Sequence, residues 1–204
     1  RIVMCGAQIA ITAIVAPIGA VAIAANTFGI TAESLCYMPG YGISDAATTL
    51  VGQSIGAQRN DLTRRFAAIA LWLGIIVMSI TGAVMFATAP LMMRLMTPDA
   101  EIIALGAEIL RIEAFAEPMF AASIVCYGIF VGAGDTLAPS IMNFASIWLV
   151  RLTLAFVLVP TMALKGVWIA MCIELCFRGV IFLSRLRFGN WNKASIAPRK
   201  TNNL

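Results

Sequence analysis

Apolar residues gather along this chain in continuous windows of helix length, and short segments rich in Gly, Pro, Asn and Asp separate the windows. A helix needs about 20 apolar residues to cross the roughly 30 Å hydrocarbon core of a bilayer. Because the apolar residues do not alternate with polar ones, membrane β-strands are excluded. The pattern predicts an all-α polytopic membrane protein, a bundle of six transmembrane helices at 1–25, 36–57, 66–93, 102–133, 138–160 and 166–184.

The two ends of the chain differ from the windows between them. The first window starts at once with Arg1 and lacks a signal-peptide layout, so we expect the chain to begin inside its first helix. Beyond residue 191 the sequence turns polar. We therefore expect one six-helix membrane domain over 1–191 and a polar cytoplasmic tail over 192–204.

Composition supports a membrane protein over a water-soluble one. Hydrophobic residues make up 61% of the chain, charged residues only 12%, and the mean hydropathy is +0.92. Soluble domains carry roughly 25% charged residues, about twice this share. A water-soluble globule is therefore excluded, and we expect the lipid bilayer as the protein's solvent.

The net charge of +4 comes from cations at alternate helix ends. Nine lie on one set of ends, against Arg94 and Lys165 on the opposite set. The nine are Arg1, Arg59, Arg64, Arg65, Arg185, Arg187, Lys193, Arg199 and Lys200. Because cytoplasmic loops collect Lys and Arg, we expect both termini in the cytoplasm, in a pattern that fits a bacterial inner membrane. The excess of positive charge is explained by the orientation of the helices in the membrane, so we expect no nucleic-acid partner.

The inventory of reactive side chains argues against an enzyme. The chain has no His, which removes a His-based triad, a His-ligated metal and a histidine proton relay. Its five cysteines lie in or beside apolar stretches without CxxC spacing, so they indicate neither a zinc site nor a disulfide framework. We expect no catalytic residues, no cofactor and no resident metal.

A carboxylate interrupts the second window. Asp45 shares one helical face with Tyr41, Thr48, Gly52 and Gly56. A charged group near the middle of a bilayer costs at least a few kcal/mol, so it needs a partner, a proton or a water-filled cavity. This face predicts either a tight seam between helices or a cavity lined by Asp45, and the pattern leaves both open.

The fourth window carries two acids. Glu113 and Glu117 lie four residues apart, hence on one face of a helix, and two carboxylates so placed in an apolar medium do not readily ionise together. The pair could hold an exchangeable proton or a cation. Alternatively, Arg111 or Arg151 neutralises one of them in a permanent ion pair. Pro118 removes a backbone donor, so we expect a kink there.

Two further charges fall inside the last windows. Arg151 lies mid-way along the fifth, where it needs an acidic partner or water. Glu174 and Arg178 on the sixth are spaced i, i+4 in the favourable order, and we expect them to satisfy each other.

Several strings together resemble a known family. They are "APIGAVAIAAN" at 16–26, "YMPGYGISDAATTLVGQSIGAQ" at 37–58, "GIFVGAGDT" at 128–136, then Arg151 and the closing "RFGNW". In this order they are similar to the carboxy-terminal six-helix lobe of the multidrug and toxic compound extrusion (MATE) transporters. The resemblance covers the chain from Arg1 to about Trp191.

The resemblance implies a twelve-helix antiporter of two six-helix lobes, of which this chain is the second. Such transporters expel amphipathic, often cationic compounds in exchange for sodium ions or protons by alternating access. The expected partners are the amino-terminal lobe of the same transporter, the bilayer and small drug-like substrates.

Two positions depart from the sodium-coupled members of that family. Some sodium-coupled members have an acid on the first helix of this lobe and a second acid on the fourth helix. The first corresponds to a position near Met4, which cannot bind sodium, and the second to a position near Phe120. Glu117 is one turn from Phe120, so sodium at Glu117 is one interpretation. The coupling ion therefore stays open between H⁺ and Na⁺.

These observations assign roles to seven residues. The candidates for ion coupling or the substrate pathway are Asp45, Glu113 and Glu117, and those for the cavity lining are Tyr41, Gln53, Tyr127 and Arg151. Two alternatives remain, a lipid-linked oligosaccharide flippase of related architecture and a membrane scaffold that transports nothing. The flippase is disfavoured because its cavity should be cationic, whereas the spans contain four acids against three arginines.

Overall fold

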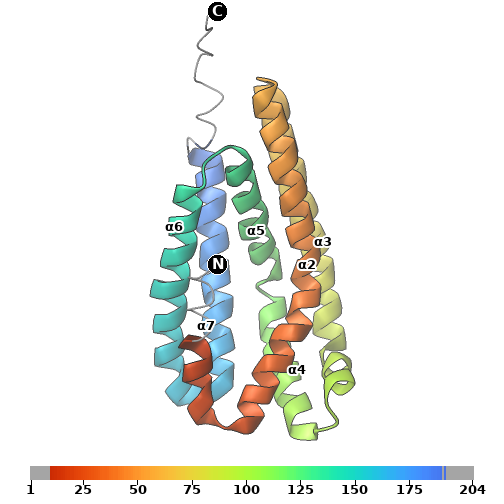
Figure 1. Cartoon of the computed structure of the whole chain (residues 1–204). Coiled ribbons are helices and arrows are strands. Elements are labelled where there is room, and N and C mark those ends of the chain that lie inside the picture. Colours follow the sequence, from red (N-terminus) through yellow and green to blue (C-terminus); the bar gives the residue numbers. More distant parts are fainter. Residues whose placement is uncertain (1–9, 190, 192–204) are drawn as a thin grey trace, which may run out of the picture.

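The computed structural model describes residues 10–189 and 191, and every regular element in this part of the chain is helical (Figure 1). Residues 10–15 are helical and lead into a 3₁₀ turn, η1. The elements are η1 (Ala16–Ile18), α2 (Ala20–Gly56), α3 (Asn60–Met96), α4 (Ala100–Ala114), α5 (Glu117–Gly132), α6 (Leu137–Ala145), the π-helical η2 (Ser146–Arg151) and α7 (Leu152–Phe188). The prediction of an all-α bundle is confirmed. The start of the first predicted span and the polar tail lie outside the described residues.

The helices run up and down along one bundle axis (Figure 1). Helices α2 and α3 form a long antiparallel pair, and α4 and α5 follow as one unit bent by 59°. The chain reverses direction inside α7 at Ala163, which has φ 50° and ψ −131°. Residues 137–162 and 164–188 therefore form two antiparallel legs, in agreement with the separate spans predicted at 138–160 and 166–184.

By length and composition, two helical stretches could each cross a membrane. They are Asn60–Met96 and Leu137–Phe188, and the bent pair of α4 and α5 adds a third. The reversal at Ala163 divides the second stretch into two legs, so its 52 residues supply two passes. With α2 and the segment before Gly19, the arrangement matches the predicted six-helix bundle.

The first two predicted spans have wrong boundaries. The chain breaks after η1, which contains Pro17, because Gly19 adopts φ 123°, a conformation that favours glycine. Helix α2 starts directly afterwards, so 26–34, predicted as a connection, is helical. Its hydroxyl residues fit a helix because each donates to a carbonyl one turn back: Thr27 to Ile23 (2.9 Å), Thr31 to Thr27 (2.9 Å) and Ser34 to Thr31 (2.6 Å).

The predicted kink in the fourth span is confirmed. Helix α4 ends at Ala114 and α5 starts at Glu117, with Pro118 in the first turn of α5, where a missing N–H is tolerated. The break lies just before the proline, and it separates the two acids of this span.

Helix α5 lies at the centre of the bundle and contacts α2, α3 and α7. It approaches α2 closely because Gly128 has no side chain: a Cβ there would lie 2.4 Å from the Ser44 carbonyl oxygen. Two hydroxyls bridge the same seam, since Ser44 donates to the Ile124 carbonyl and Thr48 to the Gly128 carbonyl, each at 2.9 Å. This seam holds α2 in register with α5.

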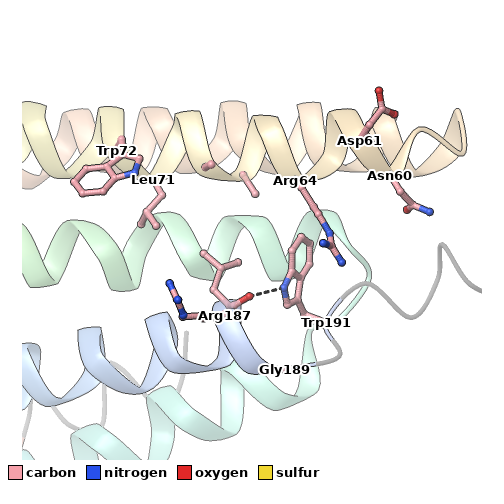
Figure 2. Close-up of a pocket in the computed structure, with 11 residues that line it drawn as sticks. Asn60, Asp61, Arg64, Leu71, Trp72, Arg187, Gly189 and Trp191 are labelled. Carbon is pink, nitrogen blue, oxygen red and sulfur yellow. Dashed lines mark hydrogen bonds between the residues drawn. The ribbon is translucent and has the colours of Figure 1, made fainter.

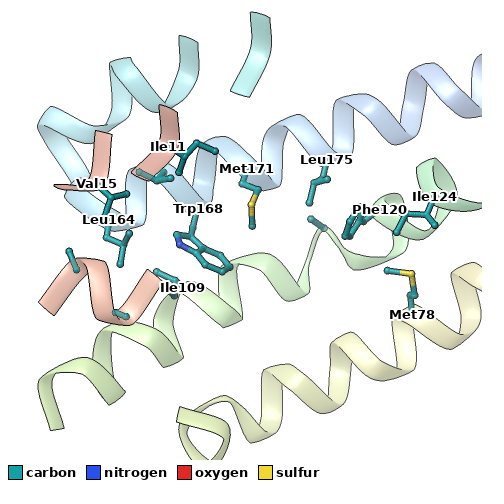
Figure 3. Close-up of a cluster of buried hydrophobic side chains, with 14 of the residues drawn as sticks. Ile11, Val15, Met78, Ile109, Phe120, Ile124, Leu164, Trp168, Met171 and Leu175 are labelled. Carbon is teal, nitrogen blue, oxygen red and sulfur yellow. The ribbon is translucent and has the colours of Figure 1, made fainter. Parts of the chain in front are cut away.

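A cluster of buried apolar side chains extends along the inside of the bundle, from Val15 and Leu164 to Phe120 and Ile124 (Figure 3). Trp168 of α7 points toward Ile109 of α4, and Val15 and Leu164 lie beside them (Figure 3). The Trp168 indole donates to the Asn26 side-chain oxygen at 3.0 Å, which joins α7 to α2. Some members of this cluster, among them Trp168 and Phe120, also line the polar site described next.

Candidate functional site

Two chambers open on the face that α2, α5 and α7 form. The Glu33 chamber, about 230 Å³, is lined by Glu33, Tyr37, Arg151 and Trp168 among others. The Asp45 chamber, about 380 Å³, is lined by Asp45, Thr48, Ser123, Tyr127 and Asn143 among others.

Three side chains belong to both chambers and form a partition between them: Tyr41, Phe120 and Arg178. The Arg178 guanidinium lies 5.5 Å from the centroid of the Phe120 ring. Tyr37 contacts Tyr41 and Phe120 edge to face, with ring centroids 5.6 Å and 5.7 Å apart. An aromatic cluster with one cation on its surface thus separates the chambers.

One stripe of α2 supplies a wall to each chamber. Glu33, Tyr37, Tyr41 and Asp45 follow one another at intervals of four residues. Residues at this spacing lie on one face of a helix. The structure therefore extends the face predicted from Tyr41 and Asp45 by about two helical turns toward the start of α2.

Arg178 pairs with Glu174 of its own helix, and a second element holds Glu174 in place. Its Nε lies 3.3 Å from Glu174 Oε1, so the predicted i, i+4 pair is confirmed, and Glu174 is fully buried. Ser146, the first residue of the π-helical turn η2, donates to the same Oε1 at 2.6 Å. Arg151 closes that turn and lines the Glu33 chamber, and its Nε lacks a hydrogen-bond partner among the described residues. π-Helical turns often mark functional sites.

Glu113 and Glu117 lie behind the chamber walls, on either side of the break between α4 and α5. They are 0% and 1% exposed, and none of their four carboxyl oxygens has a hydrogen-bond partner among the described residues. The suggested ion pair with Arg111 or Arg151 does not form within the described chain. The Arg111 Nε instead donates to the Phe86 carbonyl at 3.5 Å.

The other predicted residues occupy different positions. Asp45, Tyr41 and Tyr127 line the Asp45 chamber, and the Asp45 side chain is exposed there. Arg151 lines the Glu33 chamber. Gln53 is exposed and contributes to neither chamber.

The sequence analysis missed Glu33. It is only 6% exposed, lines the Glu33 chamber and lies within electrostatic reach of Arg151, Arg178, Glu113 and Glu117. The prediction of a loop at 26–34 hid it. The four-residue spacing back from Asp45 through Tyr41 and Tyr37 was the available signal.

The described residues contain no group of three His, Cys, Asp or Glu side chains placed to hold a metal ion. A sodium ion at Glu117 would therefore need carbonyl, hydroxyl or water oxygens to complete its shell. The chambers can bind charge through Glu33, Asp45, Arg151 and Arg178, and apolar surface through their aromatic walls.

Comparison with known proteins assigns this architecture to a family. The MatE family model matches residues 1–157. The chain belongs to the MatE family. The resemblance of its motifs to the MATE transporters is thereby confirmed.

The alignments with individual MatE relatives cover most of this chain but less than half of each relative's length. The chain is 33% identical over 184 residues to the probable multidrug resistance protein NorM of Thermotoga maritima, covering 89% of this chain and 40% of that protein. It is 23% identical over 181 residues to the multidrug resistance protein MdtK of Yersinia pestis, covering 86% and 40%.

A solved structure supports the same fold. The outward-facing conformation of a multidrug resistance MATE family transporter matches with a TM-score of 0.85 at 17% identity, covering 91% of this chain and 42% of that one. The chain thus spans about 40% of the length of the MatE proteins it matches.

Proposed function

We propose that this chain is the carboxy-terminal lobe of an antiporter that exports amphipathic, often cationic compounds in exchange for H⁺ or Na⁺. The observation that carries this proposal is the pair of chambers, one containing Asp45 and the other Glu33, on an open face of an otherwise apolar bundle. In the complete transporter, an amino-terminal lobe would cover this face, and the two lobes would rock about the enclosed cavity.

The Asp45 chamber is the proposed substrate side. Its volume of about 380 Å³ falls in the range of roughly 300–1,000 Å³ that small-molecule sites occupy. Asp45 provides the charge that attracts a cation, and Tyr41, Phe120 and Tyr127 provide rings that stack on apolar and cationic groups. Affinity for varied compounds then comes from shape-tolerant aromatic contact plus one carboxylate.

The buried carboxyl groups are the proposed coupling side. Glu33 borders the Glu33 chamber, and Glu113 and Glu117 lie behind it without hydrogen-bond partners among the described residues. A proton or a sodium ion that binds one of them changes its charge in an apolar setting. That change supplies the differential interaction that a shift between inward- and outward-open states requires.

Orientation follows from the cations. Arg59, Arg64, Arg185 and Arg187 lie at the end of the bundle where α2 turns into α3 and α7 stops (Figure 1). We assign this end to the cytoplasm of a bacterial inner membrane, since cytoplasmic loops are the basic ones.

The two alternatives fit the site less well. A pyrophosphate headgroup needs a cationic cavity, whereas the charges that line the two chambers are balanced, Glu33 and Asp45 against Arg151 and Arg178. A scaffold gains nothing from burying Glu113 and Glu117 without partners, because an unsatisfied buried polar group destabilises the fold.

The test is efflux of a cationic dye from vesicles that contain this lobe joined to its amino-terminal lobe, under an imposed pH or sodium gradient. Asp45→Asn should raise KM about tenfold, which corresponds to about 1.4 kcal/mol. Glu33→Gln and Glu117→Gln should abolish the dependence of efflux on the gradient.

Glu108→Gln is the matched control. Glu108 is an exposed acid of α4 that pairs with Lys165 at 2.6 Å and borders neither chamber. It should leave efflux unchanged. Wild-type rates and gradient dependence in all three folded site variants would refute the proposal.

A further inference from the structure

A groove of about 690 Å³ lies between the start of α3 and the end of α7 (Figure 2). Its walls include Arg64, Leu71 and Trp72 of α3, and Leu186, Arg187 and Trp191 at the other side. None of its lining residues borders the two chambers, which are lined by Ile11 and by residues of α2, α5, α6, η2 and α7. The groove is therefore separate from the proposed transport site.

One wall of the groove is fixed. Trp191 is 8% exposed, its indole donates to the Leu186 carbonyl at 2.9 Å, and its ring lies 6.3 Å from that of Phe130. Figure 2 shows Arg64 extending from α3 toward this tryptophan. The groove therefore has a well-ordered wall at Trp191, with the Arg64 guanidinium on the facing side.

The groove carries uncompensated positive charge. Arg64 and Arg187 are exposed, and neither forms an ion pair within the described chain. The acid at the rim, Asp61, is already engaged by Arg59, with both contacts at 3.0 Å. Two guanidinium groups are therefore left to bind an anion.

The groove also lies at the depth of lipid headgroups. The apolar stretch of α3 starts at Phe66, two residues after Arg64. From there an exposed apolar stripe runs along α3, with Ile69, Trp72, Ile76 and Ile80 between 52% and 63% exposed. Tryptophan side chains prefer the membrane interface, and this groove has two.

We propose that the groove binds an anionic phospholipid of the leaflet on this side. Its phosphate binds in the cleft that Arg64 and Arg187 line, and an acyl chain follows Leu71, Trp72 and the stripe on α3. Continuity between the cationic cleft and the apolar stripe favours a lipid over a soluble anion, because a free phosphate would use only the cleft. This site goes beyond the proposed transport function and needs no substrate.

The experiment uses the purified 204-residue chain in neutral detergent and follows its thermal unfolding during titration with phosphatidylglycerol, phosphatidylcholine or inorganic phosphate. A ligand that binds only the folded state raises Tm in proportion to its occupancy. Phosphatidylglycerol should raise Tm, whereas phosphatidylcholine and inorganic phosphate should not. Each arginine near the surface contributes roughly fivefold in affinity, so the Arg64→Ala, Arg187→Ala double variant should bind about 25-fold more weakly.

Two further variants make the result specific. Arg65→Ala removes an exposed cation from the same turn of α3 but outside the groove, and it should bind as wild type does. Ala68→Trp fills the groove at an exposed position without changing the charge, and it should abolish the lipid-dependent shift. Equal weakening by Arg65→Ala, an equal shift with inorganic phosphate, or an unaltered shift in Ala68→Trp would each overturn the proposal. None of these outcomes depends on transport.

Discussion

Replacing Gly128 with alanine would place a methyl group in the seam between α5 and α2. The added Cβ would lie 2.4 Å from the carbonyl oxygen of Ser44, 2.4 Å from its Oγ and 3.0 Å from its carbonyl carbon. Two of these atoms belong to the backbone, so a side-chain rotation cannot relieve the clash. The helices must move apart.

The cost has two parts. Overpacking of a well-packed interface destabilises by about 1–3 kcal/mol. Separation also weakens the Ser44 and Thr48 bonds across the seam, at about 0.6 kcal/mol each for interhelical bonds in a membrane protein. The expected loss for Gly128→Ala is therefore about 2–4 kcal/mol, before a gain of up to about 1 kcal/mol from replacing glycine in a helix.

Reversible unfolding in detergent measures this loss, and Gly42→Ala is the control. Gly42 also lies inside a helix, but a Cβ there would meet no atom within 4 Å. That variant should gain up to about 1 kcal/mol from helix propensity alone. The reasoning fails if both variants change stability in the same direction and by the same amount.

Two further substitutions test the reversal of the chain at Ala163 and the pairing of Arg178 with Glu174. Ala163→Gly should raise Tm, with a gain of roughly 1 kcal/mol, because glycine adopts the positive φ of the turn without strain; Ala170→Gly, in the helical part of α7, should lower it by a similar amount. Glu174→Gln should destabilise by about 3–5 kcal/mol because it leaves Arg178 buried without its counter-charge. Adding Arg178→Met should restore most of that loss, and an additive effect of the two changes in chemical unfolding would contradict the pairing.

Hydropathy and turn chemistry were sufficient to predict most of the fold. Continuous apolar windows located the helices, and Pro118 and the gaps between the predicted spans at 134–137 and 161–165 marked breaks that the structure has. The error at the start of α2 has a physical cause. Thr27 and Thr31 are polar in the sequence but bond to their own helix, so a polar segment that resembles a connection stays helical within the bundle.

The candidate site was only partly predictable. Asp45 and Tyr41 stood out because polar groups are costly inside apolar windows, but Glu33 escaped notice once its segment had been interpreted as a loop. Glu113 and Glu117 do not line either chamber because of the bend between α4 and α5. The spacing of residues along a single helix does not predict this bend. Packing between helices, rather than the pattern of any one of them, decided which acids border a cavity.

The shared partition gives the proposed antiport a means of coupling. Arg178 borders both chambers, and it lies within electrostatic reach of Glu33 and Glu113. A cation in the Asp45 chamber is repelled by this guanidinium, and a change in the charge of Glu33 alters how strongly the same guanidinium is held. Linkage makes the effect reciprocal: if neutralising Glu33 weakens cation binding beside Asp45, then a bound cation must oppose that neutralisation by the same factor. The coupling ion at Glu33 and the cation beside Asp45 then compete through Arg178. They can exchange without occupying the same chamber.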